Sequence, residues 1–116
     1  MEMIAYNNYV LPNPDKIKLK EQGFHYNRSM SDSECDFYSL KFPVLQYLKS
    51  TTVEGEIIID MNSGEIRVNA YNYGTKGCYT PFYRTKCDSV YKTIIQKINK
   101  VFKNMFSKVG IERAGD

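Results

Sequence analysis

The chain has 116 residues, of which 42% are hydrophobic and 25% are charged, and its formal net charge is +3. This composition excludes an intrinsically disordered chain, and no apolar run approaches the roughly 18 residues that cross a membrane. The length predicts one domain over residues 1–116 with a single hydrophobic core. The mild positive charge permits an acidic partner without requiring one.

The first residues and the cysteines predict where the protein resides. Residues 1–16 have no positively charged start and no long apolar stretch, so they do not resemble a signal peptide. The three cysteines, Cys35, Cys78 and Cys87, are an odd number in a chain large enough to fold without disulfides. We therefore expect a cytoplasmic protein with free thiols and no disulfide.

The region before residue 37 predicts a short helix followed by a loop. Asn13 suits the N-cap, Pro14 the first helical position and Asp15 the first turn. Gly23 can end this helix. Residues 28–36 are polar and rich in turn-forming types, so they predict a loop.

Residues 37–50 predict a β-strand. Apolar and polar side chains alternate from Tyr38 to Phe42, which is the period of two that a half-buried strand shows. Pro43 has no N–H to donate to a neighbouring strand, so an edge or a bulge is expected at that position.

Residues 56–71 predict a β-hairpin. The isoleucines at 57–59 favour a strand, and the turn at 62–64 contains Gly64, which suits a positive φ. Alternation resumes at residues 66–70 and predicts a second strand with one apolar face.

A second turn, at residues 74–77, leads to the aromatic segment 78–83. We expect this segment to complete an antiparallel meander of three or four strands. Phe82 is expected to face the core, and some of the tyrosines to face outward.

Residues 88–109 predict a long amphipathic helix that Asp88 or Ser89 caps and Gly110 ends. Its apolar side chains fall on one arc roughly 160° wide, which requires a sheet face beneath it. Residues 111–116 are expected to fray. The predicted fold class is α+β, an antiparallel meander of three to five strands packed against this long C-terminal helix, with a short N-terminal helix. The helix residues expected to be buried are Ile94, Ile98, Val101 and Met105.

No residue pattern predicts catalysis or a bound metal. His25, the one histidine, has no framed Ser or Cys nucleophile, and the cysteines lack the close pairing of zinc ligands. We therefore predict a non-enzymatic protein without cofactor or metal. A nuclease or hydrolase that uses carboxylates of the hairpin is the weaker alternative, although acids on a hairpin are more often its solvated face. These acids are Glu54, Glu56, Asp60 and Glu65.

Two sets of residues predict an interaction surface. Lys92, Lys100 and Lys103 lie within about 80° of one another on the last helix, where they could follow phosphates or serve only as a solvated face. The aromatic residues of segment 71–84 could anchor a partner or stack on bases, or could pin the sheet to the helix. The predicted partner-binding residues are Tyr73, Tyr79, Tyr83, Arg84, Lys86, Lys92, Lys100 and Lys103.

Several short runs between residues 37 and 111 carry a resemblance to known proteins. They are Phe42-Pro43-Val44, Glu54-Gly55-Glu56, Gly64-Glu65, Ala70-Tyr71-Asn72-Tyr73-Gly74-Thr75, Tyr79-Thr80-Pro81-Phe82-Tyr83 and Val109-Gly110-Ile111. These runs resemble a family of small uncharacterised proteins of prophages and conjugative elements in low-GC bacteria. The resemblance implies no enzyme activity. Several proteins of comparable size in such elements are anti-CRISPR proteins, so by genomic habitat it implies an inhibitor of a CRISPR effector.

Two functions follow as expectations. The first is a non-enzymatic inhibitor of a bacterial defence effector, such as a Cas9-type RNA-guided nuclease, that grips an acidic surface of the effector or competes for its guide RNA. Mimicry of DNA is disfavoured because the chain is basic. The alternative is a small nucleic-acid-binding accessory or regulatory protein of a phage or conjugative element, which would bind bare RNA or DNA in a salt-dependent way. No membrane is expected as a partner.

Overall fold

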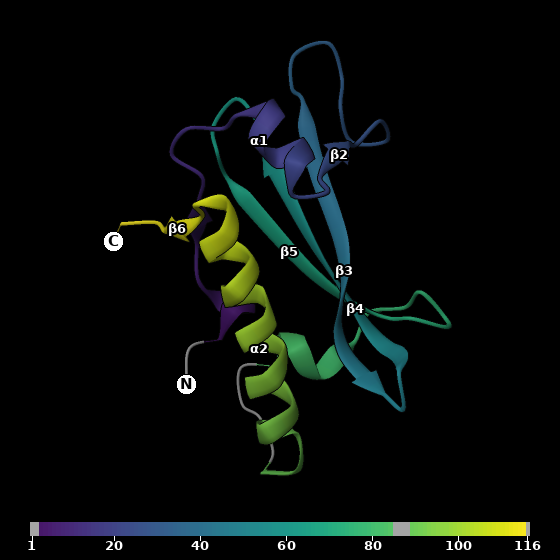
Figure 1. Cartoon of the computed structure of the whole chain (residues 1–116). Coiled ribbons are helices and arrows are strands. Elements are labelled where there is room, and N and C mark those ends of the chain that lie inside the picture. The colour runs from purple at the N-terminus through teal and green to yellow at the C-terminus, as the bar shows by residue number, and fades with distance from the viewer. Residues whose placement is uncertain (1–2, 85–88, 116) are drawn as a thin grey trace.

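The computed structural model describes residues 3–84 and 89–115, with side chains described from residue 91 onward in the second range. It is an α+β structure in which a long C-terminal helix lies across an antiparallel sheet, and the predicted fold class is confirmed (Figure 1). The elements, with 3-10 helices written η, are in chain order η1 (Ile4–Tyr6), β1 (Tyr9–Val10), α1 (Lys16–Glu21), β2 (His25–Tyr26), β3 (Phe37–Tyr47), β4 (Ser50–Asp60), β5 (Ile66–Asn72), η2 (Thr80–Tyr83), α2 (Ser89–Val109) and β6 (Glu112–Arg113).

The main sheet has the strand order β2-β3-β4-β5, and every neighbouring pair is antiparallel. Strands β3 and β4 are joined by a tight turn in which Leu48 and Lys49 have φ values of 48° and 68°, as a two-residue hairpin turn of the right twist requires. Strand β4 therefore begins six residues before the predicted hairpin. At Pro43 the register between β3 and β4 shifts, which confirms the predicted irregularity.

The turn between β4 and β5 is the one that the sequence predicts. Gly64 has a φ of 79°, and a Cβ atom there would lie 2.3 Å from the carbonyl oxygen of Leu11. Only glycine accepts both conditions without strain. Asp60 closes the turn, because its Oδ1 accepts hydrogen bonds from the backbone amides of Asn62 and Ser63.

Helix α2 packs against the sheet through a stripe of four buried side chains at the spacing of one helix face. Phe102 lies at its centre, with ring centroids 5.2 Å from Phe42 of β3 and 5.4 Å from Phe82 of η2. The stripe consists of Ile95, Ile98, Phe102 and Phe106. The expected burial of Ile98 is thus confirmed, whereas the other three expected residues are only partly buried at the margins of the stripe. These three are Ile94, Val101 and Met105.

Gly55 of β4 allows α2 to approach the sheet closely. A Cβ atom at this position would lie 2.6 Å from Cγ1 of Val44 and 2.9 Å from Cζ of Phe102. The absence of a side chain therefore creates the space that the Phe102 ring uses.

The prediction that residues 78–83 form a fourth strand of the meander is wrong. Cys78 makes one isolated bridge to Tyr71, and the chain then turns into the 3-10 helix η2, in which Pro81 and Phe82 are buried. Pro81 fixes its own φ and lacks an N–H, which suits the start of a short helix better than a ladder position. The inward position expected for Phe82 is confirmed.

The ends of the helices agree with the sequence in part. The N-cap of α1 is Asp15 and not Asn13, because Asp15 Oδ1 accepts hydrogen bonds from the amides of Ile17 and Lys18 at 2.9 and 3.3 Å. Gly23 and Gly110, with φ values of 96° and 85°, follow α1 and α2 as expected. The expected cap of α2 at Asp88 or Ser89 lies outside the described residues and side chains.

The segment expected to fray, residues 111–116, is partly ordered into strand β6. Tyr9 of β1 pairs with Arg113 of β6, and the guanidinium of Arg113 donates a 2.7 Å hydrogen bond to Asn7 Oδ1. Ile111 is buried just before this strand. The two ends of the described chain thus form a small ribbon beside the main sheet (Figure 1).

Candidate functional site

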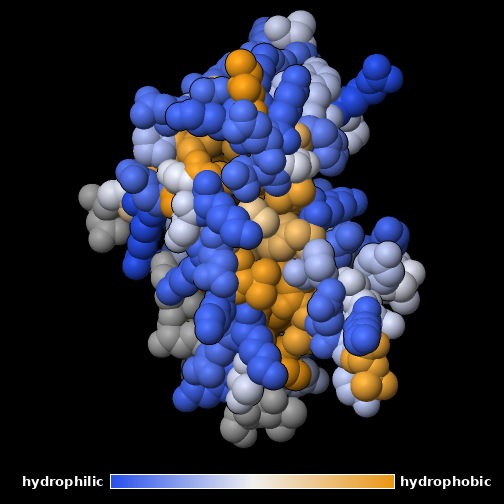
Figure 2. All heavy atoms as spheres, viewed as in Figure 1, coloured by the Kyte–Doolittle hydropathy of each residue, from blue (hydrophilic) through white to orange (hydrophobic). Residues whose placement is uncertain are grey.

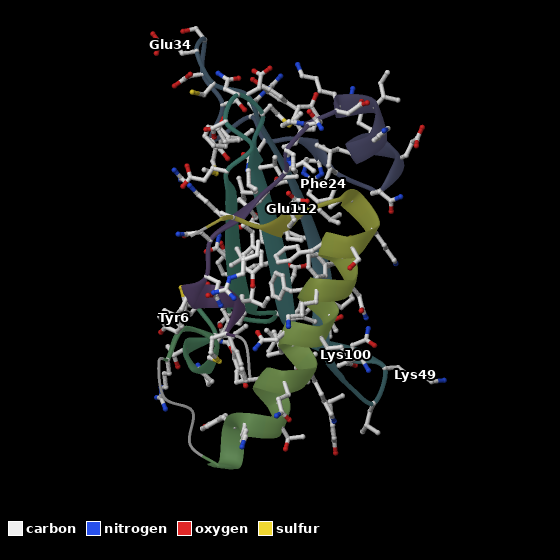
Figure 3. The ribbon with its side chains drawn as sticks, turned by 90° about the vertical axis from the view of Figure 1, so that its left-hand side faces the viewer. Tyr6, Phe24, Glu34, Lys49, Lys100 and Glu112 are labelled. Carbon is white, nitrogen blue, oxygen red and sulfur yellow. The ribbon has the colours of Figure 1, made fainter. Side chains whose placement is uncertain are left out.

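Helix α2 presents a lysine surface, defined here as Lys92, Lys97, Lys100, Lys103 and Lys108, all of them exposed. Lys100 projects from the helix in Figure 3, and hydrophilic residues follow the outer side of α2 in Figure 2. The helix contains no acidic residue. In the part of the chain that the structure describes, Lys92, Lys97, Lys100 and Lys108 have no ion-pair partner. The lysine surface is therefore exposed and has no acidic residue of α2 beside it.

The three tyrosines expected beside the lysine surface differ in exposure. Tyr73 is 49% exposed, and Lys76 Nζ lies 5.7 Å from its ring centroid. Tyr79 and Tyr83 are half-buried. Burial raises the pKa of the Tyr79 phenol, and the neighbouring Tyr91 of α2 raises it further.

Tyr83 faces the sheet and not the solvent. Its hydroxyl accepts a 2.8 Å hydrogen bond from the backbone N–H of Ala70, at the outer edge of β5. Burial raises the pKa of this phenol, although the Ala70 hydrogen bond opposes that shift. The side chain thus satisfies a strand-edge donor, and the expectation that it points outward is wrong.

The predicted residues do not form one continuous patch. Helix η2 contacts α2, with the Phe82 ring stacked on Phe102 beyond the middle of α2. Tyr79, just before η2, lies near Tyr91, which precedes Lys92 in the first part of α2. The turn that carries Tyr73 instead projects from the sheet on the side away from α2 (Figure 1). Arg84 is exposed, and Lys86 lies outside the described residues.

His25 belongs to strand β2. It pairs with Ser39 of β3, and its side chain shares a face of the sheet with Ser39. Both line a cleft of about 530 Å³, which lies on the face opposite α2. The cleft is lined by His25, Tyr26, Asn27, Arg28, Ser29, Ser39, Lys41 and Glu56.

Glu56 is buried in this cleft although it is charged, with 7% of its surface exposed. Its Oε1 accepts hydrogen bonds from Asn69 Nδ2 at 3.1 Å and from the Tyr71 hydroxyl at 2.9 Å. Burial, and next the hydrogen bond to Glu56, raise the pKa of the Tyr71 phenol above its ordinary value. Glu56 is therefore not the solvated hairpin acid that was expected.

The position of Glu56 follows from the pairing of β4 with β3 and not from a pattern within β4. Glu56 pairs with Lys41, so its carboxylate lies beside a basic side chain on the face opposite α2, where it accepts the hydrogen bond from the Tyr71 hydroxyl. The sequence did not predict the pairing of Glu56 with Lys41, because it placed the start of β4 at residue 56 and not at Ser50.

The other hairpin acids and the cysteines form no further cluster. The Asp60 carboxylate accepts a hydrogen bond from the Asn62 amide within the β4–β5 turn. In residues 3–84 and 89–115, no group of three or more His, Cys, Asp or Glu side chains could hold a metal ion. Cys35 and Cys78 are unpaired thiols, and Cys87 lies outside the described residues. Burial, and then the nearby Asp60, raise the pKa of the Cys35 thiol. Within the described residues, no helix combines the length and the hydropathy of a membrane-spanning segment.

Comparison with known proteins gives a fold and no function. No protein-family model matches the chain, and no curated protein matches it in sequence. Among solved structures, the chain is similar to a DUF1831 family protein from Lactobacillus plantarum, with a TM-score of 0.53 and 9% sequence identity. The similarity covers 98% of this chain and 94% of that one. At this identity it shows a shared fold alone.

Proposed function

We propose that the protein is a non-enzymatic binding protein whose lysine surface contacts an anionic partner. One observation carries this proposal: α2 holds five exposed lysines and no acid, while the rest of the chain carries more acids than bases. The mild net charge of the whole chain thus conceals a separation of charge. Such a surface attracts an anionic partner at long range and orients it before contact.

The partner proposed first is a bacterial defence effector such as a Cas9-type RNA-guided nuclease, engaged on an acidic protein surface or through its guide RNA. The resemblance to proteins of prophages and conjugative elements supports this choice. A positive surface favours those two targets over the positively charged channels in which such effectors hold nucleic acid. The protein would then act as an anti-CRISPR inhibitor.

The second candidate is a nucleic-acid-binding accessory protein of a mobile element. Lys92, Lys97, Lys100 and Lys108 support it, because within the described part of the chain they make no ion pair and so are available to replace the counterions of phosphates. The two candidates differ in what they need. The accessory protein binds bare RNA or DNA tightly, whereas the inhibitor requires the effector.

The test is a charge-matched pair of triple variants. The first variant carries Lys92→Ala, Lys100→Ala and Lys103→Ala, and the control carries Lys18→Ala, Lys20→Ala and Lys49→Ala, which are exposed lysines outside α2. Lys49 lies at the far tip of the β3–β4 hairpin (Figure 3). Both variants lose the same net charge, so a difference between them reports position and not overall charge.

Binding to fluorescent RNA and DNA is measured by anisotropy at low and high salt, beside inhibition of target cleavage by a guide-loaded Cas9-type nuclease. We expect the α2 variant to lose binding or inhibition, with a smaller loss at high salt because salt screens exposed charges. The control variant should behave like the parent. Equal behaviour of both variants with every partner at both salts would reject the lysine surface as a binding site.

A further inference from the structure

The cleft on the open face of the sheet is a second candidate site, separate from the lysine surface. Its walls come from β2, the loop after it, β3 and β4, and α2 lies on the other face of the same sheet. A volume of about 530 Å³ lies in the range of small-molecule sites. The proposed function makes no use of these residues, so the cleft requires its own explanation.

The floor of the cleft contains one acceptor and one donor, carried by the buried residues Glu56 and Ser39. Both of these hydrogen bonds to Glu56, from Asn69 and Tyr71, end on Oε1, and Oε2 accepts none from the described residues. Ser39 is 4% exposed, and its oxygen accepts a 3.3 Å hydrogen bond from Asn27 Nδ2, which leaves the hydroxyl proton for another acceptor. Ser39 and Glu56 are diagonal neighbours on one face of the β3–β4 pair, where side chains lie about 7–8 Å apart.

A ligand hydroxyl group matches this floor. A hydroxyl both donates and accepts, so adjacent hydroxyls of a sugar can donate to Glu56 and accept from Ser39. An apolar ligand would instead leave two buried polar groups without partners, at a cost in free energy for each.

The rim of the cleft is basic. His25, Arg28 and Lys41 are exposed, and none of them makes an ion pair within the described part of the chain. Lys41 Nζ lies 5.9 Å from the ring centroid of Tyr71, whose hydroxyl holds Glu56. Arg28 and Lys41 outnumber the single carboxylate on the floor, so the cleft favours a ligand with net negative charge.

From the polar floor and the basic rim together, we propose that the cleft binds a phosphomonoester of a hydroxyl-bearing sugar. The sugar hydroxyls would contact Glu56 and Ser39, and the phosphate would contact Arg28 and Lys41. Arginine binds phosphate through paired hydrogen bonds, and lysine adds a point charge. The same chemistry occurs in a free sugar phosphate and in a nucleoside monophosphate. The nucleoside monophosphate also carries a nucleobase, and the experiment below separates the two ligands by this difference.

Isothermal titration calorimetry with four probes tests the proposal: inorganic phosphate, ribose, ribose 5-phosphate and adenosine 5′-monophosphate. Ribose 5-phosphate should bind about tenfold or more tightly than phosphate, because one further charge-assisted hydrogen bond has about that effect. Ribose alone should not bind measurably. Tighter binding of the nucleotide than of ribose 5-phosphate identifies a nucleotide site, and equal affinity identifies a sugar-phosphate site. If ribose 5-phosphate binds no better than inorganic phosphate, the surface is merely basic and the proposal is overturned.

Three variants locate the binding. Arg28→Ala changes an exposed side chain and should weaken ribose 5-phosphate binding about tenfold without unfolding the protein. Ser39→Ala should reduce the advantage of ribose 5-phosphate over phosphate while phosphate binding stays unchanged. Lys100→Ala, on the opposite face, is the control and should bind like the parent. Unchanged affinity in the Arg28 variant would overturn the proposal and leave the lysine surface untouched.

Discussion

The two faces of the main sheet are built from the same strands but carry opposite chemistry. On the face under α2, Gly55 and Ile57 alternate toward a closely packed aromatic cluster around Phe102. On the other face, Glu56 and Ser39 are buried among hydrogen bonds and basic side chains. Neighbouring residues of one strand thus serve packing and polar recognition in turn. The difference predicts that stability depends mainly on the covered face and ligand chemistry on the open one.

The largest expected effect on stability is that of Phe102→Ala. Phe102 is fully buried and its ring contacts those of Phe42, Phe82 and Phe106, so its removal leaves a cavity at the centre of the covered face. The free energy of unfolding should fall by about 3–5 kcal/mol, measured by urea denaturation. Lys100→Ala on the same helix is the control, with a change below about 0.5 kcal/mol. A loss in the Phe102 variant as small as in the control would contradict the assignment of stability to this face.

Gly55→Ala tests how closely the same face is packed. The new methyl group would meet Val44 and Phe102 at 2.6 and 2.9 Å, so side chains must shift and about 1–3 kcal/mol of stability should be lost. Gly74→Ala is the matched control, since no atom lies within 4 Å of the position that its Cβ would take. Equal thermal stability of the two variants would show that the contact between α2 and β4 is looser than described.

Glu56→Gln tests the open face and should be milder. The amide oxygen can still accept from Asn69 and Tyr71, but the bonds are no longer charge-assisted, so a loss of about 1 kcal/mol is expected. Chemical denaturation of Glu56→Gln, Tyr71→Phe and the double variant gives the coupling between the two side chains. A loss as large as that of Phe102→Ala would break the contrast between the faces.

The smallest effect concerns pH. Because the pKa of the Tyr71 phenol is raised in the folded protein, the folded state retains a proton that the unfolded chain loses near pH 10. The contribution of Tyr71 is therefore fully present below about pH 10 and is lost as pH rises above it. Unfolding curves between neutral pH and pH 11 should show this decline, and Tyr71→Phe should make it less steep, leaving the part that Tyr79 and Tyr83 contribute. An equally steep decline in the Tyr71→Phe variant would exclude Tyr71 as its source.

The parts of the fold predicted correctly depend on local patterns. The wide apolar arc of α2, the alternation around Phe42 and Ile66, and the glycine turn at Gly64 each depend on residues close in sequence. The buried stripe of α2 differed from the expected residues by about one position, because the direction of the helix toward the sheet is set by Phe42 and Gly55, which are distant in sequence.

The parts that the sequence did not predict depend on contacts between distant segments. Residues 78–83 contain aromatic residues typical of a strand. In the structure, however, the Tyr83 hydroxyl accepts a hydrogen bond from the Ala70 N–H, and the Phe82 ring stacks on Phe102. Tertiary contacts of these side chains therefore determine the conformation of the segment. The cleft brings together His25, Ser39 and Glu56 from three strands. Its lining depends on strand order and register, which no single segment of the sequence contains.

The pairing of β1 with β6 has a consequence for the timing of folding during synthesis. The hairpins β3–β4 and β4–β5 consist of neighbouring segments and can form as soon as they leave the ribosome, whereas Tyr9 must wait for Arg113. At ordinary translation rates that delay is roughly 5–20 s. During this interval Ile4, Tyr9 and Leu11, all buried in the finished fold, lack the part of the core that α2 and Ile111 supply, and Tyr9 lacks the ring of Phe106. The newly made chain therefore passes through a period in which its first segment is open to chaperones and to association with other chains.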